Sequence, residues 1–228
     1  MRFLCSSLHG VGTNSKPLCA TSLAMDTPMI LWKGCSPMSW HRVCVAHCGH
    51  AGLFADNKSE IRDIVPTNDQ GFSYFDPDSV SASLQAVHDL ETLIEEDGPY
   101  DAVLAFSQGM MLACTLLMHL VQEKKPLPFK CAVFFSPRMA PLNYVDLQSG
   151  AFTEIDANVV TDVIEIPTAL VWGSRDPCAG KAVELKKIFQ SDTLSTVVHE
   201  GSHEVPGYAF KDALMQAVKV IRRTIDLV

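Results

Sequence analysis

Short apolar runs recur along the chain, and each one ends in small or turn-forming residues. The runs cover residues 2–5, 102–106, 131–135, 168–172 and 196–198. A continuous apolar run of this length, rather than an alternating one, is typical of a strand buried on both faces of a parallel sheet. We therefore expect a strand of such a sheet at each of these positions, with 43–46 as a weaker candidate for another.

Helical patterns lie between the expected strands. Apolar residues spaced three or four apart form one stripe at Val80, Leu84, Val87, Leu90 and Ile94. Asp76-Pro77 provides an N-cap followed by a first-turn proline, and Gly98 ends this helix. A second stripe covers 210–225, and 108–121 is apolar nearly all round, which predicts a helix buried in the middle of the fold.

The alternation of strands and helices predicts a three-layer α/β fold, with a mostly parallel central sheet and helices on both faces. No internal repeat, low-complexity tract or linker divides the sequence, so we expect residues 1–228 to form a single domain. Residues 15–40 fit this pattern badly because prolines interrupt any long crossover helix there.

Composition narrows the class of protein. The chain is 47% hydrophobic and 19% charged, which is enough apolar material for one sizeable core, and its formal net charge of −8 argues against a nucleic-acid partner. No apolar run approaches the roughly 18 residues of a membrane span. The apolar stretch at the start is too short for a signal peptide, so we expect a cytoplasmic protein, without a membrane partner, whose eight cysteines are free thiols.

A cluster of histidines and cysteines raises the alternative of a metal site. Five potential zinc ligands lie within ten residues, namely His41, Cys44, His47, Cys48 and His50. Structural zinc sites usually combine two separated ligand pairs, and this compact cluster has no second pair. We therefore favour a buried segment with incidental thiols and expect no metal and no other cofactor.

Ser107 is the strongest candidate for a catalytic residue. It follows the expected strand 102–106 directly and opens the apolar helix, in the sequence Ala-Phe-Ser-Gln-Gly at 105–109. This context is a nucleophile elbow of the Gly-x-Ser-x-Gly type with alanine in place of the first glycine, and alanine is small enough for the close approach of strand and helix. The alternative is a helix N-cap serine.

A serine hydroxyl becomes a strong nucleophile when a histidine takes its proton and an acid orients that histidine. In the α/β-hydrolase order of serine, acid and histidine, the acid is Asp176, after the strand 168–172, and the base is His203, in the turn after the next strand. Such positions meet at the carboxyl edge of a parallel sheet. The rival base is His199, at the end of a strand, and the rival acid is Asp162, which precedes a strand and should lie at the wrong end.

An oxyanion hole needs two backbone N–H groups. One is expected from Gln108, at the N-terminus of the helix, where the helix dipole adds to the effect. The other is expected from the turn at 8–12 (Leu-His-Gly-Val-Gly), most simply from Val11. The alternative for the glycines of this segment is an ordinary tight turn.

Aromatic and aliphatic residues gather in two loops expected near the site. They are Phe72, Tyr74 and Phe75 before the first helix, and Leu142 and Tyr144 after the third of the long strands. Such loops suggest an apolar acyl pocket with a lid. The alternative is that these side chains fold onto the core.

Taken in order, the motifs resemble the fungal family of serine hydrolases (FSH). They are Leu8-His9-Gly10, the elbow at 106–109, Gly173-x-x-Asp176-Pro177 and the histidine segment 199–206. The likeness covers residues 1–14 and roughly 52–228. It implies an α/β-hydrolase fold and an esterase or acyl-thioesterase of the kind often encoded with polyketide synthases, whose acyl carrier protein would then be a partner.

Residues 15–50 depart from the family pattern, either through divergence or through a mistaken exon boundary. Three functions follow: a serine thioesterase or carboxylesterase, a non-catalytic α/β-hydrolase relative that binds a small molecule or partner, and a metal-assisted protein built on 41–50. We favour the first, with a medium-length acyl thioester as substrate. Ester and thioester are not separable by sequence because both pass through the same acyl-enzyme.

Overall fold

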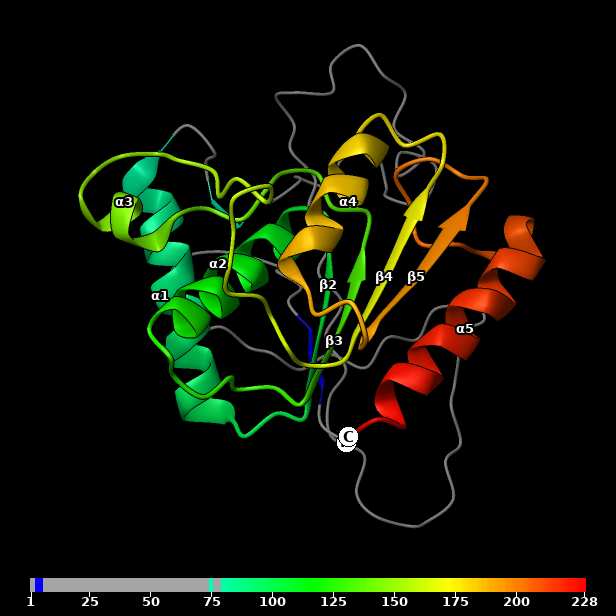
Figure 1. Cartoon of the computed structure of the whole chain (residues 1–228), viewed down its shortest axis with the longest axis horizontal. Helices are drawn as coiled ribbons and strands as arrows, with labels where there is room; N and C mark the ends of the chain where they lie inside the picture. Colours follow the sequence, from blue (N-terminus) through cyan, green and yellow to red (C-terminus); the bar gives the residue numbers. More distant parts are fainter. Residues whose placement is uncertain (1–2, 6–73, 76–78) are drawn as a thin grey trace, which may run out of the picture.

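The computed structural model describes residues 3–5, 74–75 and 79–228 (Figure 1). Several expectations therefore lie outside the described residues. They are the strand at 43–46, the cluster at 41–50, the atypical segment 15–50, the turn at 8–12 with Val11, and Phe72. The single domain spanning the whole chain stays a prediction.

Within the described residues, five parallel strands form one sheet whose spatial order follows the chain. They are β1 (Phe3–Cys5), β2 (Ala102–Phe106), β3 (Cys131–Phe135), β4 (Thr168–Gly173) and β5 (Leu194–His199). Every expected strand within the described residues is present, and β2 and β3 have the expected bounds. The arrowheads point the same way in Figure 1, so the segments that follow β2, β3, β4 and β5 all leave the same edge of the sheet.

The helices of the described region lie between and after these strands. They are α1 (Val80–Asp97), α2 (Gln108–Gln122), α3 (Tyr144–Gln148), α4 (Ala179–Leu185) and α5 (Lys211–Ile225), with 3₁₀ turns η2 (Lys186–Ile188) and η3 (Tyr208–Phe210). Residues 108–118 are all buried, which confirms that α2 lies in the middle of the fold. The apolar pattern did not predict α3 and α4, because helices of five and seven residues are too short to show a stripe.

The start of α1 corrects the expected N-cap. The helix begins at Val80, and Ser79 is its N-cap, with its Oγ accepting the Ala82 N–H at 3.2 Å. The expected cap at Asp76 is wrong, because Ser79 already satisfies a free N–H of the first turn. The expected end is confirmed: the Gly98 N–H donates to the Ile94 carbonyl at 3.0 Å.

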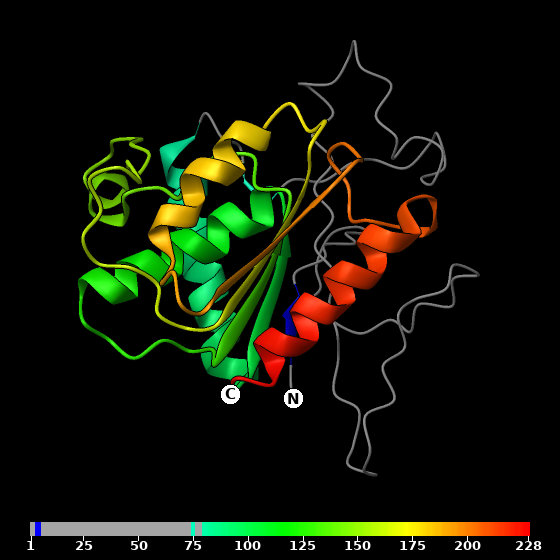
Figure 2. The ribbon, with the colours of Figure 1, turned by 45° about the vertical axis from the view of Figure 1, so that its right-hand side comes forward.

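Figure 2 shows the sheet nearly edge-on, with α1 to α4 on one side and α5 on the other. Alternate residues of β3 enter the two cores: Ala132 and Phe134 pack with α1, α2 and α4, whereas Val133 and Phe135 pack with Ala217 of α5. Side chains of a strand alternate between the faces of a sheet, so a strand buried on both faces must be apolar throughout. This three-layer arrangement is the α/β-hydrolase fold that the sequence predicted. Among the described residues, no helix has the length and hydrophobicity to cross a membrane.

Candidate active site

Three side chains from the carboxyl edge of the sheet form one hydrogen-bonded chain. Ser107 Oγ lies 2.8 Å from His203 Nε2, although the two residues are 96 positions apart in the sequence. His203 Nδ1 in turn lies 2.8 Å from Asp176 Oδ2. The structure thus brings together the serine, histidine and acid that the sequence singled out. The distances allow Ser107 to pass its proton to His203 while Asp176 orients the imidazole ring.

Ser107 occupies the sharp turn between β2 and α2. Its backbone has φ 54° and ψ −118°, a conformation that is strained for a residue with a side chain. The residue stands at the N-cap position, yet its side chain makes no capping hydrogen bond, and Oγ faces His203 instead. The geometry therefore favours the nucleophile elbow over the alternative of a simple N-cap serine.

Asp176 is buried, and both of its carboxylate oxygens have partners. Oδ1 accepts the Cys178 N–H at 2.8 Å, and Oδ2 faces His203 Nδ1. Burial raises the pKa of Asp176, but the hydrogen bonds from His203 and from the Cys178 N–H outweigh it and hold the pKa below its ordinary value. An ionised Asp176 accepts only, so His203 Nδ1 carries the proton and Nε2 is free to accept the proton of Ser107.

The loop after β4 and the loop after β5 are fastened to each other by their backbones. The Ser174 N–H donates to the His199 carbonyl at 2.7 Å, and the Arg175 N–H donates to the Gly201 carbonyl at 3.0 Å. Gly173 permits this approach, because a Cβ there would lie 2.4 Å from the Gly201 carbonyl oxygen. The acid and the histidine are therefore positioned as one unit.

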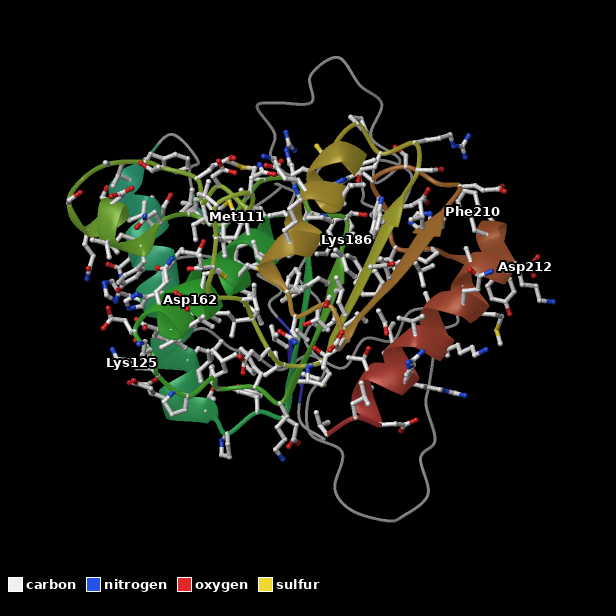
Figure 3. The ribbon with its side chains drawn as sticks, viewed as in Figure 1. Met111, Lys125, Asp162, Lys186, Phe210 and Asp212 are labelled. Carbon is white, nitrogen blue, oxygen red and sulfur yellow. The ribbon has the colours of Figure 1, made fainter. Side chains whose placement is uncertain are left out.

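The rival base and the rival acid lie elsewhere. Both ring nitrogens of His199 are used in its own turn: Nε2 donates to the Glu204 carbonyl at 3.2 Å, and Nδ1 accepts the Gly201 N–H at 3.1 Å. Asp162 is exposed and lies on the segment that leads into β4, away from the arrowhead end of that strand (Figure 3). His203, rather than His199, contacts Ser107, and Asp176, rather than Asp162, contacts His203.

Gln108 combines the expected backbone donor with a side-chain role that sequence reasoning missed. It is the first residue of α2, so its N–H lies at the positive end of the helix dipole. Its side-chain amide also accepts the Tyr74 N–H at 3.1 Å through Oε1 and donates to the Phe75 carbonyl at 3.1 Å through Nε2. The segment 74–75 is thus held directly beside the elbow, where Phe75 is buried in the core and Tyr74 is half-buried against it.

The structure does not bring Leu142 and Tyr144 to Ser107. The Leu142 N–H donates to Thr115 Oγ1 at 2.9 Å, and the ring of Tyr144 stacks on His119 with centroids 3.9 Å apart. At 1.5 Å per helical residue, these contacts lie about 12 and 18 Å along α2 from the serine. Both side chains are buried in the core, as the alternative interpretation of this loop proposed.

Metal ligands do not gather in the part of the chain that the structure describes. No group of three or more histidine, cysteine, aspartate or glutamate side chains there could hold an ion. Among the cysteines whose side chains the structure describes, Cys114, Cys131 and Cys178 are free thiols.

Comparison with known proteins shows the family of this chain. The family model described as "Serine hydrolase (FSH1)" matches residues 2–213. The chain belongs to this family. The resemblance drawn from the sequence motifs is thereby confirmed, and the protein is an enzyme of the serine hydrolase class.

Three curated relatives align over most of their length. "Esterase FPY3" of Fusarium mangiferae is 28% identical over 99% of both chains. "Hydrolase phiM" of a fungal species is 29% identical over 90% of this chain and 86% of its own. "Probable esterase azaC" of Aspergillus niger is 28% identical over 97% of this chain and 84% of its own.

Proposed function

We propose that this serine hydrolase cleaves acyl thioesters or esters through a triad of Ser107, His203 and Asp176. The observation that carries the proposal is the continuous chain of two 2.8 Å contacts from the serine hydroxyl to the buried carboxylate. Membership of the serine hydrolase family supports the same reaction.

Acylation begins when Ser107 Oγ attacks the acyl carbonyl carbon and His203 Nε2 takes the hydroxyl proton. Asp176 stabilises the imidazolium that forms. The carbonyl oxygen of the tetrahedral intermediate accepts the N–H of Gln108, with the N–H of Val11 as the second donor. Each such donor contributes about 2.7–4 kcal/mol to the stabilisation of the transition state.

Collapse of the intermediate breaks the bond to the leaving alcohol or thiol. His203 returns its proton to that leaving group, and the acyl chain stays on Ser107 as an ester. His203 then takes a proton from a water molecule, whose oxygen attacks the carbonyl carbon of the acyl-enzyme. The bond to Ser107 Oγ breaks, His203 returns the proton to Oγ, and the carboxylic acid leaves the regenerated enzyme.

The substrate class that we propose is an acyl thioester on a carrier protein or on coenzyme A. Medium-length aliphatic chains are preferred, and release of a polyketide or related acyl chain in the cytoplasm is the proposed role. Tyr74, half-buried in the segment that Gln108 holds beside the elbow, supports an apolar pocket for the acyl chain. Each buried methylene contributes about 0.8 kcal/mol, so two would favour the longer chain roughly tenfold.

A carboxylesterase that acts on small oxygen esters is the second candidate. The names of two relatives, "Esterase FPY3" and "Probable esterase azaC", favour it. Both candidates use the same acyl-enzyme, so only the substrate distinguishes them.

Two measurements test the proposal. A fluorophosphonate probe should label the wild type and leave Ser107→Ala unlabelled; an unlabelled wild type would support a non-catalytic binding protein instead. Rates with acetyl, hexanoyl and decanoyl thioesters, each beside the matching oxygen ester, then identify the substrate class. A preference for acetyl oxygen esters would favour the carboxylesterase.

A further inference from the structure

We propose that His199 is a positioning residue for the base His203, and that it acts with Ser136 by holding the carbonyl of Glu204. This inference rests on the proposed function, because it concerns how the turn at 200–204 presents His203 to Ser107.

One imidazole ring spans both ends of this turn. His199 Nδ1 accepts the Gly201 N–H at 3.1 Å, near the start of the turn, and Nε2 donates to the Glu204 carbonyl at 3.2 Å, at its end. His203 lies between these two contacts in the sequence. The ring therefore fixes the backbone on both sides of the base, provided that it is neutral and carries its proton on Nε2.

Ser136 holds the same carbonyl from a different strand. It directly follows β3, is fully buried, and its Oγ donates to the Glu204 carbonyl at 3.2 Å. Its φ of 43° is uncommon for a residue with a side chain. The Glu204 carbonyl thus receives one donor from the end of β5 and one from the end of β3, and the turn cannot shift without breaking both.

Packing around the ring is tight. A Cβ at Gly201 would lie 2.7 Å from His199 Nδ1 and 2.3 Å from Glu204 Oε1, so the turn closes over the ring only because residue 201 is glycine. The ring of Phe210, in η3, lies with its centroid 5.8 Å from that of His199, and Figure 3 shows Phe210 beside the end of β5. The imidazole is therefore enclosed by its turn and by an aromatic ring.

Protonation of His199 would break this arrangement. A proton on Nδ1 would face the N–H of Gly201, so two donors would oppose each other. Burial lowers the pKa of His199, and the hydrogen bond to the Glu204 carbonyl and the charges of Glu204 and Asp176 offset this only in part. Glu204 in the same turn and Asp176 in the loop after β4 are the charged groups that act on it within the described chain, and Phe210 is uncharged.

Three variants separate positioning from packing. His199→Phe keeps an aromatic ring and removes both hydrogen bonds, so kcat should fall about 10- to 100-fold with KM within about threefold of the wild type. His199→Gln offers a donor and an acceptor that do not titrate, and should restore kcat to within about fivefold. His119→Phe is the matched control, because His119 Nδ1 has no hydrogen-bond partner within the described region and the residue lies about 18 Å along α2 from Ser107.

The pH dependence provides the readout that a purely structural role would not change. In the wild type, the acid limb of log kcat/KM should steepen from a slope of one to a slope of two, because protonation of His199 is a second event that removes activity. In His199→Gln the slope should stay at one. Short assays after a pH jump, with activity recovered at pH 8, exclude irreversible unfolding.

Each outcome supports or overturns the inference. Wild-type kcat in His199→Phe overturns it, and so does a slope of one in the wild type, a result that stands even if His199→Phe does not fold. An equal loss of activity in His199→Phe and His199→Gln also overturns it, because the ring would then serve packing rather than the two hydrogen bonds. A wild type that the fluorophosphonate probe does not label overturns the proposed function and this inference together, whereas normal labelling with an unaffected His199→Phe overturns the inference alone.

Discussion

Asp176→Asn should lower turnover by about 10⁴-fold while the fold stays intact, because its two oxygens have different partners. Oδ1 accepts the Cys178 N–H and Oδ2 accepts the His203 Nδ1–H, each at 2.8 Å. An asparagine has one accepting oxygen and one donating NH₂ group in these places. Since the backbone N–H of Cys178 can only donate, the amide oxygen must face it, and the NH₂ group then faces His203.

The NH₂ group of the asparagine is a donor, so Nδ1 of His203 must be unprotonated to accept a hydrogen bond from it. Its proton then resides on Nε2, 2.8 Å from Ser107 Oγ, so His203 can no longer accept the proton of the serine. A 10⁴-fold loss corresponds to about 5.4 kcal/mol of activation free energy. Little stability should be lost, because asparagine matches the shape of aspartate and keeps the hydrogen bond to Cys178.

The assay compares the wild type, Asp176→Asn and Asp162→Asn with a p-nitrophenyl hexanoate substrate, and circular dichroism reports thermal unfolding. Asp162 is exposed, so its variant should keep wild-type turnover. Turnover of Asp176→Asn within tenfold of the wild type would refute the tautomer argument. An equal loss in Asp162→Asn would refute the choice of the acid.

Four further outcomes are expected. Ser107→Ala should lose about 10⁴–10⁶ in turnover with an unchanged Tm, measured by ester hydrolysis and calorimetry. Gly173→Ala should lower kcat about 100-fold, because its Cβ would lie 2.1 Å from a backbone carbonyl oxygen, whereas Gly180→Ala, whose Cβ meets nothing within 4 Å among the described residues, should keep wild-type kcat. Gln108→Met should raise the KM for a hexanoyl ester about fivefold, through loss of its two hydrogen bonds to 74–75. The depressed pKa of Asp176 stabilises the fold above pH about 4 and loses that effect as the pH falls through the folded-state value, so chemical unfolding of Asp176→Asn should show a flatter acid limb.

The sheet could be predicted where the strands are buried on both faces. β2 and β3 have continuous apolar runs that end at a serine or a loop, and the structure has the expected bounds. β5 is longer than the expected 196–198, because Val198 is exposed and Leu194 only partly buried, so the strand does not show as one apolar run. A strand that is partly exposed includes polar residues, so its bounds cannot be identified from a continuous apolar run.

The positions of Ser107, Asp176 and His203 could be anticipated because each follows a strand of one parallel sheet, and such strands end at one edge. The location of Leu142 and Tyr144 could not. Their loop packs along α2 through contacts with Thr115 and His119, which are set by tertiary structure rather than by spacing in the sequence.

Ser107 and Ser136, two serines with strained backbones, help to position the site at this edge of the sheet. Ser107 and Ser136 each follow the last residue of adjacent strands that are in register, and both have positive φ, 54° and 43°. Such conformations cost of order 1–3 kcal/mol each and persist only where the surroundings impose them. Here both hydroxyls reach one loop: Ser107 Oγ meets His203, and Ser136 Oγ meets the carbonyl of Glu204, the next residue. The strained turn at Ser107 thus presents the nucleophile to His203, and the strained turn at Ser136 holds the backbone that carries His203. Both turns therefore help to set the distance of 2.8 Å between Ser107 Oγ and His203 Nε2.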